Sequence, residues 1–185
     1  MLYEFLTFFI AGMDTTGHLL TMASYYLLKN PECMKKVMAE VNQHIKSDDD
    51  LNTENLGKMN YLSAVIKETL RVATPAPTLF DRTACEDVTI GDLKIKKGTN
   101  VSIALATLNF SPEYHDEPEK FDPERWLNPD SKTNQTTSKN PYVFTPFSAG
   151  GRNCIGQHLA MMETKIILSM FLKRFDYEMA DKDYQ

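Results

Sequence analysis

The residues best suited to do chemistry lie in a glycine-rich loop at positions 147–156. Its three glycines permit positive φ angles and the close approach of a flat ligand. Cys154 is expected at the N-terminus of a helix, where unpaired amides and the helix dipole favour a thiolate. A thiolate is a soft axial ligand that suits iron. Arg152 adds a fixed positive charge that can bind a carboxylate on the same bound group.

A zinc site and a purely structural cysteine are the alternatives at this position. Cys154 and His158 lie four residues apart on the expected helix and could hold zinc together. No second pair of ligands at a suitable spacing accompanies them. For a lone cysteine, a buried residue behind a glycine-rich helix start is the favoured interpretation. The loop chemistry by itself leaves the three possibilities open.

The loop resembles the haem-binding loop of the cytochromes P450, with the pattern Phe147-x-x-Gly150-x-Arg152-x-Cys154-x-Gly156. Five fixed residues make a chance match on the order of 10⁻⁷ per position. The resemblance implies that Cys154 is the proximal ligand of haem b (iron protoporphyrin IX). It also implies that Arg152 binds a haem propionate and that Phe147 packs beside the ring on the thiolate side.

Two further segments are similar to signatures of that family. Glu68 and Arg71 match its Glu-x-x-Arg pattern, and the run 123–126 resembles its Pro-Glu-Arg-Phe segment, with Trp126 in place of the phenylalanine. Residues three apart share one side of a helix, and taken alone such a pair is an ordinary surface ion pair. The resemblance implies a triad with Arg125 that has a structural role in haem-site assembly and no role in bond-making.

The stretch 11–16 resembles the oxygen-binding part of the family's long central helix. Gly12 removes a side chain where a ligand must approach and is expected to loosen the helix locally. The Thr15 hydroxyl donates and accepts hydrogen bonds, and Asp14 can relay protons from water, so the resemblance makes this pair the catalytic residues. An ordinary irregularity in a core helix is the alternative.

Arg82 and the remaining cysteines carry weaker signals. The run 82–88 is similar to a segment that, in many relatives, places an arginine on the second haem propionate. A solvated surface arginine is an equally good interpretation of Arg82. No motif surrounds Cys33 or Cys85, so both are predicted to be ordinary small residues that are buried or half-buried.

Apolar periodicity predicts the helices that position these residues. A long central helix over 2–28 is apolar on almost every face, which is typical of a helix inside a larger protein. Asn30 is expected to cap the next helix, whose stripe ends at Ile45, and a third helix is expected over 56–72. A last helix follows the loop, with an expected buried stripe of Leu159, Met162, Ile166, Ile167, Met170 and Phe171.

The middle of the chain has a different texture. Residues 88–95 predict a hairpin with a two-residue turn, and 101–105 predict a third strand. The segment 112–146 holds six of the nine prolines and is expected to be irregular but ordered. We call it the proline-rich segment. The fold class expected is mainly α with small β-sheets, as in part of a cytochrome P450 fold.

Composition excludes several other classes of protein. The 185 residues are 42% hydrophobic and carry a net charge of −5, which excludes wholesale disorder and argues against a nucleic-acid-binding surface. Three well-separated cysteines, an odd number, argue against a disulfide framework. The apolar run 5–13 is far shorter than the roughly 20 residues that span a bilayer, and no basic residue precedes it. No anchor or secretion signal is therefore expected in this chain.

The resemblance implies that residues 1–185 are the C-terminal portion of a single cytochrome P450 domain, about half of it, without its N-terminal half or its C-terminal β-hairpin. The expected parent is a haem–thiolate monooxygenase of the endoplasmic reticulum membrane. It would insert one oxygen atom from O₂ into a lipophilic small molecule with electrons from a separate reductase, because no flavin or nicotinamide fingerprint is present.

Two alternatives from other functional classes stay open: a catalytically silent haem-binding fragment, and a zinc or interaction module built on Cys154 and His158. The apolar helix over 2–28 would leave much surface uncovered in isolation. At roughly 25 cal/mol per Å² of apolar area, the loss could exceed the net stability of a domain. The isolated polypeptide is therefore predicted to aggregate and to hold haem poorly.

Overall fold

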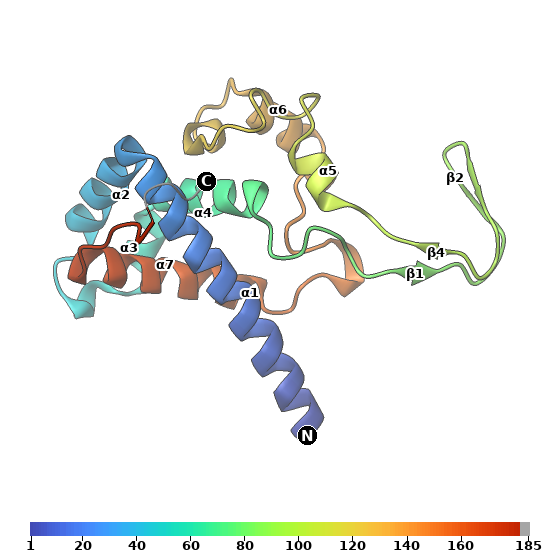
Figure 1. The fold of residues 1–185 in the computed structure, drawn as a ribbon, viewed down its shortest axis with the longest axis horizontal. Coiled ribbons are helices and arrows are strands. Elements are labelled where there is room, and N and C mark those ends of the chain that lie inside the picture. Colours follow the sequence, from blue (N-terminus) through green and yellow to red (C-terminus); the bar gives the residue numbers. More distant parts are fainter. Residues whose placement is uncertain (182–185) are drawn as a thin grey trace.

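The computed structural model describes residues 1–181. Figure 1 shows α1, α2, α4 and α7 gathered into a bundle, with the strands extending to one side, which confirms a mainly α fold with small β-sheets. Several helices are short 3₁₀ turns, labelled η. The elements in chain order are α1 (Leu2–Lys29), α2 (Pro31–His44), η1 (Asp48–Asp50), α3 (Thr53–Lys58), α4 (Asn60–Val72), β1 (Arg82–Thr83), β2 (Val88–Ile90), β3 (Leu93–Ile95), β4 (Asn100–Val101), α5 (Leu105–Asn109), η2 (Pro123–Trp126), α6 (Lys132–Lys139), η3 (Pro141–Val143), η4 (Gly150–Arg152) and α7 (Gln157–Arg174).

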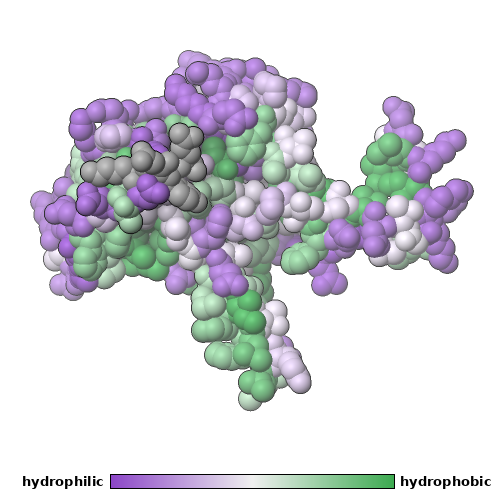
Figure 2. Space-filling view, viewed as in Figure 1, coloured by the Kyte–Doolittle hydropathy of each residue, from purple (hydrophilic) through white to green (hydrophobic). Residues whose placement is uncertain are grey.

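Helix α1 has the length that the sequence predicts, and its two halves differ in environment. The C-terminal half packs against α2, α4 and α7 through buried residues at helical spacing: Thr16, Leu19, Ala23 and Leu27. The N-terminal half projects from the bundle (Figure 1), and its side chains are apolar on the face that Figure 2 displays. Phe5 and Phe9 stack on each other there with their ring centroids 6.1 Å apart, and both are more than half exposed.

The core lies where α1, α2, α4 and α7 meet. Each helix contributes residues three or four positions apart, as expected for one buried face of a helix. The buried apolar side chains of α2, α4 and α7 include Val37, Val41, Leu62, Val65, Ile66, Leu168 and Leu172.

The buried face of α7 differs from the stripe that the sequence predicts. Leu159 is 69% exposed, and Met162 and Ile167 are also exposed. The residues that turn inward include Thr164 and Leu168. Apolar residues occur around most of this helix, so their spacing does not select a face. The contacts of α7 with α1 and α4 decide which side is buried.

The helix predicted over 56–72 is broken at Met59, whose φ of −79° and ψ of 78° are not helical. The break gives α4 a free N-terminus, where unpaired backbone N–H groups need acceptors. The Glu40 carboxylate, from α2, accepts hydrogen bonds from the backbone N–H groups of Tyr61 and Leu62, both at 2.8 Å. A side chain distant in sequence therefore caps α4 and fixes its start.

The end of α3 is tied in a similar way to α7. The Lys165 ammonium donates a hydrogen bond of 3.0 Å to the main-chain carbonyl of Leu56. Burial lowers the pKa of Lys165, and the nearby Glu40 carboxylate opposes that shift. The corner between α3 and α4 is thus held by one charged side chain from α2 and one from α7.

The junction between α1 and α2 differs from the expectation in one contact. Pro31 is the first residue of α2, as predicted, but the Asn30 side chain makes no capping hydrogen bond to that helix. Its amide instead donates to the main-chain carbonyl of Tyr26, at 2.8 Å. Asn30 therefore finishes α1 rather than starting α2, because the last carbonyls of a helix also need partners.

The predicted hairpin forms from β2 and β3, with Val88 opposite Ile95 and a turn at Gly91, whose φ is +56°. The predicted strand over 101–105 is shorter than expected. Strand β4 ends at Val101 and pairs with β1, and α5 begins at Leu105. Leu105 is buried at the start of α5 and not within a strand.

The proline-rich segment is ordered, as predicted, but contains the helix α6, which its polar sequence does not predict. The Ser131 hydroxyl accepts a hydrogen bond from the backbone N–H of Asn134, at 3.1 Å, and so caps α6. Within α6, Thr133 is buried although its neighbours are polar. The segment covers the end of α4 through η2, which is the most extensive contact of α4.

We predict that Glu40→Ala lowers the free energy of unfolding by about 1–3 kcal/mol, because two backbone N–H groups of α4 lose their acceptor. Urea denaturation followed by circular dichroism measures the change. Glu163→Ala is the matched control, since Glu163 is an exposed helical glutamate with no hydrogen bond or ion pair within residues 1–181. Equal stability losses in the two variants would contradict the capping role.

Candidate functional site

The carboxylate of Glu68 is buried and accepts hydrogen bonds from both arginines of the predicted triad. Arg71 donates to it through Nε (3.0 Å) and Nη2 (2.8 Å), and Arg125 donates through Nε at 2.9 Å. Glu68 and Arg71 are fully buried and Arg125 is nearly so. The expected contacts among the three are therefore present, in a buried network and not on the surface. We call this group the Glu68 cluster.

The two guanidinium groups also bind main-chain carbonyls of the proline-rich segment and α5. Arg71 Nη1 donates to the carbonyl oxygens of Asn109 (2.8 Å) and Pro118 (2.6 Å). Arg125 Nη1 donates to that of Asp116 at 2.8 Å, and both arginines reach the carbonyl of Lys120. The segment is thus fastened to α4 through its backbone, which leaves no guanidinium charge without acceptors.

Trp126 is part of the Glu68 cluster. Its indole Nε1–H donates to Glu68 Oε2 at 2.8 Å, and the backbone N–H of Asp122 donates to Oε1 at 2.9 Å. Trp126 also packs against Phe144, with ring centroids 4.5 Å apart. The departure from the family pattern at this position therefore adds a hydrogen-bond donor that a phenylalanine lacks. Sequence reasoning noted the substitution but not this contact.

The Cys154 loop is closed by backbone hydrogen bonds. The N–H of Cys154 donates to the carbonyl of Phe147 at 2.9 Å, and that of Asn153 donates to Gly150 at 3.2 Å. Positive φ angles occur at Ser148 (62°) and Gly150 (79°), which form the turn. Helix α7 begins at Gln157, directly after the loop as predicted, and Cys154 precedes its first residue by three positions.

Phe147 lies on the inner side of this loop, half-buried against the core. It lines a cavity of about 270 Å³ between the loop and α4, together with Lys67, Leu70, Phe144 and Met161. The outer side of the loop is different. Cys154 is exposed and Ile155 is 83% exposed.

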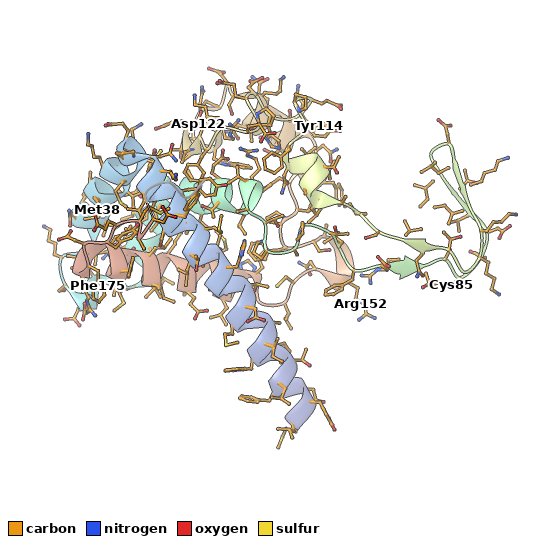
Figure 3. The ribbon with its side chains drawn as sticks, in the orientation of Figure 1. Met38, Cys85, Tyr114, Asp122, Arg152 and Phe175 are labelled. Atoms are coloured by element: carbon orange, nitrogen blue, oxygen red, sulfur yellow. The ribbon has the colours of Figure 1, made fainter. Side chains whose placement is uncertain are left out.

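Arg152 and Arg82 both have free guanidinium groups. Each side chain is exposed, and neither makes a hydrogen bond or ion pair within residues 1–181. Figure 3 shows Arg152 projecting from the loop away from the helical bundle, on the side where β1 begins. Arg82 lies on β1, opposite Val101 of β4. Both charges are therefore free to bind an anionic ligand.

Asp14 and Thr15 lie on the projecting half of α1 and are exposed. The Thr15 hydroxyl donates to the carbonyl of Ala11, at 2.7 Å. Gly12 has open space around its α-carbon, but α1 runs through it without a break, so the expected local loosening is not present. No hydrogen bond among the described residues joins this stretch to the Cys154 loop.

Comparisons with known proteins identify the family of the chain. The family model described as Cytochrome P450 matches residues 1–185. The chain belongs to the cytochrome P450 family. It is 41% identical over 177 residues to cytochrome P450 4V2 of Mus musculus, which covers 95% of this chain and 33% of that protein. Probable cytochrome P450 4s3 of Drosophila melanogaster is 37% identical over 179 residues, or 97% of this chain and 33% of its own length.

The chain thus spans about a third of the length of these P450 relatives, a smaller share than the half expected from the motifs. Cytochrome P450 71A8 of Mentha piperita is 38% identical over 171 residues. The match covers 92% of this chain and, again, 33% of that protein. Within residues 1–181, no helix is long and apolar enough to cross a membrane.

The residues on the outer side of the Cys154 loop have the chemistry that a haem needs. A P450 haem is a flat apolar ring with two carboxylates, and it needs a thiolate, apolar neighbours and cations. The structure offers an exposed thiol on Cys154, exposed apolar side chains on Ile155 and Leu159, and the unpaired charges of Arg152 and Arg82. Apolar side chains left this open in a folded chain are typical of a surface that binds something.

Zinc is less well supported at the same position. Residues 1–181 contain no group of three or more His, Cys, Asp or Glu side chains that could hold a metal ion, so Cys154 and His158 lack further protein ligands. Of the other cysteines, Cys33 is half-buried as expected. Cys85 is exposed on the hairpin side of the molecule (Figure 3), so the expectation of burial is wrong there, because the hairpin projects from the core.

One buried polar residue escaped sequence reasoning entirely. His115 is fully buried, with Nδ1 2.9 Å from the Thr133 hydroxyl of α6. Its ring centroid lies 6.5 Å from that of Trp126. No motif or periodicity marks His115, because the proline-rich segment has neither a helical nor a strand pattern over these residues.

We predict that Glu68→Gln lowers the free energy of unfolding by about 3–5 kcal/mol, because it leaves two buried guanidinium groups without a carboxylate. That loss is a large part of a typical domain's stability. Asp116→Asn is the matched control, since it breaks only an exposed ion pair with Lys132, at 3.0 Å, and should cost under about 1 kcal/mol. Urea denaturation measures both, and similar losses would contradict a special role for the Glu68 cluster.

Proposed function

We propose that this chain carries the iron-ligand loop and the oxygen-side helix of a haem–thiolate monooxygenase. The reaction would insert one oxygen atom from O₂ into a lipophilic small molecule, with electrons from a separate reductase. The observation that carries the proposal is the exposed Cys154 thiol on a closed loop, beside open apolar residues and the free charge of Arg152. Membership of the P450 family supports a haem–thiolate monooxygenase in general.

Cys154 would be the protein ligand of haem b. Haem bound through a thiolate supplies an iron centre that activates O₂, and electron donation from the sulfur favours O–O cleavage. The chain's own task is to present the thiol in one place. The hydrogen bond from the Cys154 N–H to the Phe147 carbonyl closes the loop, and the positive φ at Gly150 lets it turn. These contacts give the loop backbone one defined path around Cys154.

Arg152 and Arg82 would orient the haem through its two carboxylates. Charge-assisted hydrogen bonds from guanidinium to carboxylate are short and about twice as strong as neutral ones. Because neither arginine has a partner within residues 1–181, neither must break an ion pair in order to bind. Phe147 supports the loop from beneath, where it packs against the core.

Thr15 and Asp14 would hold and move protons on the oxygen side. Thr15 Oγ1 donates to the Ala11 carbonyl, so its lone pairs are free to accept a hydrogen bond. Asp14 is the adjacent residue and is exposed to solvent, from which a carboxylate can collect a proton. The open space at Gly12 leaves room for a small molecule beside the helix.

The Glu68 cluster would have a structural role only. It fastens the proline-rich segment to α4, and that segment leads directly into the Cys154 loop at Phe147. A fixed segment reduces the conformational freedom of the loop, so less entropy is lost when a ligand binds. For a full-length parent we propose association with the endoplasmic reticulum membrane through segments outside this chain.

Although haem occupancy of the isolated chain is expected to be low, we predict that the soluble fraction that retains haem, reduced under carbon monoxide, shows the red-shifted Soret band of a thiolate-bound haem. Cys154→Ser should abolish the band, whereas Cys85→Ser, at another exposed cysteine, should leave it unchanged. A band that survives in Cys154→Ser would contradict the ligand assignment. A thiolate band without substrate turnover would favour a catalytically silent haem-binding fragment instead.

We also predict that Arg152→Gln weakens haem retention about tenfold or more, because a charged hydrogen bond contributes about 1.5–3 kcal/mol. Haem transfer to an excess of apomyoglobin, followed by absorbance, measures the dissociation rate. Lys139→Gln is the control, since Lys139 is an exposed cation at the end of α6. An unchanged rate in Arg152→Gln would remove Arg152 from the binding site.

A further inference from the structure

His115 is a buried titratable group that the haem chemistry does not use. Its Nδ1 bonds to the Thr133 hydroxyl at 2.9 Å, while its Nε2 is buried and has no hydrogen-bond partner among the described residues. Buried polar atoms without a partner are uncommon in folded proteins, and each calls for an explanation. Figure 3 shows its neighbour Tyr114 in the same layer as Asp122, above α4.

The surroundings of His115 are rich in positive charge. Arg71 of α4 and Arg125 of η2 are close enough to lower its pKa, and Glu68 opposes them. Burial is the largest influence, and together these lower the pKa of His115 from 6.5 to about 4. In its own segment the adjacent residue Asp116 pairs with Lys132 of α6 at 3.0 Å.

Only a neutral ring suits this place. A neutral ring with its proton on Nδ1 can donate to the Thr133 hydroxyl and then has only a lone pair, and no N–H, on Nε2. A protonated ring would instead carry a second N–H, on Nε2, with no acceptor among the described residues. It would also add a positive charge beside Arg71 and Arg125, in a site that solvent does not reach.

His115 connects two parts of the proline-rich segment. Through Thr133 it contacts α6, and its ring lies beside Trp126, whose indole N–H donates to Glu68. Helix α6 is tied to the same place by a second contact, since the amide of Asn134 donates to the Trp126 carbonyl at 3.4 Å. The histidine therefore lies between a surface helix and the Glu68 cluster.

We propose that His115 is a positioning residue whose neutral ring holds α6 and Trp126 against the Glu68 cluster, so that protonation of this one side chain releases both. The proposal concerns the folded chain itself and does not depend on the haem chemistry. Its direction with pH follows from the shift. Because the pKa is lower in the folded protein than the ordinary 6.5, the folded state favours the neutral ring. The stability that the neutral ring contributes to the fold is fully present above pH 6.5. It is lost as the pH falls from 6.5 toward about 4.

Trp126 is the single tryptophan of the chain, so tryptophan fluorescence reports on this place alone. The full chain is titrated from pH 7.5 downward while the emission maximum of Trp126 is recorded. We expect a red shift as the ring becomes hydrated, centred between about pH 4 and 6.5. Far-UV circular dichroism at each pH separates local release from global unfolding.

Two variants test the histidine itself. His115→Gln cannot be protonated, so the transition should move down by about one pH unit or more. Thr133→Val keeps the shape but removes the partner of the neutral ring, so release should occur about half a unit higher or more. His158→Gln changes an exposed histidine in the same way and should leave the midpoint where it is.

The same midpoint in His115→Gln as in the unaltered chain would overturn the proposal, because carboxylates would then govern the release. If His115→Gln does not fold, Thr133→Val decides, and an unmoved midpoint there also overturns it. Proton NMR of the four histidine rings gives a direct reading of the same quantity. The ring of His115 should titrate near its pKa of about 4, and the absence of such a titration would contradict a buried neutral His115.

Discussion

The structure depends on keeping the carboxylate of Glu68 charged in a place that water does not reach. Removing a carboxylate from water costs several kcal/mol, which opposite charges offset only when every remaining donor and acceptor is also bonded. Here the two oxygens receive hydrogen bonds from Arg71, Arg125, Trp126 and a backbone N–H. The guanidinium groups in turn need carbonyl oxygens, and these come from the proline-rich segment. The proline-rich segment therefore follows a path that brings its carbonyl oxygens within hydrogen-bond distance of the two buried arginines.

This constraint also explains what sequence reasoning could and could not find. Glu68, Arg71 and Arg125 were identifiable because their spacing resembles a family signature. The carbonyls that bind them carry no sequence signal, since every residue has one, and His115 lies in a stretch without periodicity. The buried face of α7 was mispredicted for the opposite reason. Its apolar residues surround the helix, so a small residue such as Thr164, and not the largest side chains, marks the contact with the bundle. Helix starts set by distant side chains, such as Glu40, are equally invisible in the local sequence.

The candidate haem residues differ from the Glu68 cluster in how many hydrogen bonds and ion pairs they make. Cys154, Arg152 and Arg82 are exposed and unpaired within the described residues, and the half of α1 that carries Thr15 projects from the bundle (Figures 1 and 2). Polar groups inside the bundle are instead almost all bonded. The contacts of the Glu68 cluster are thus satisfied among the described residues, whereas the candidate haem residues are exposed.

The charged contacts at the corner between α3 and α4 have a consequence for the order of folding. The Glu40 carboxylate reaches across 21 residues to Tyr61, Glu68 reaches across 57 to Arg125, and Lys165 reaches across 109 to Leu56. Closing a longer loop costs more entropy, so near contacts tend to form before distant ones. A chain leaving the ribosome can therefore set the register of α4 from α2 first, dock the proline-rich segment onto it second, and add α7 last. The nucleus of the fold then lies in residues that are synthesised before the cysteine loop.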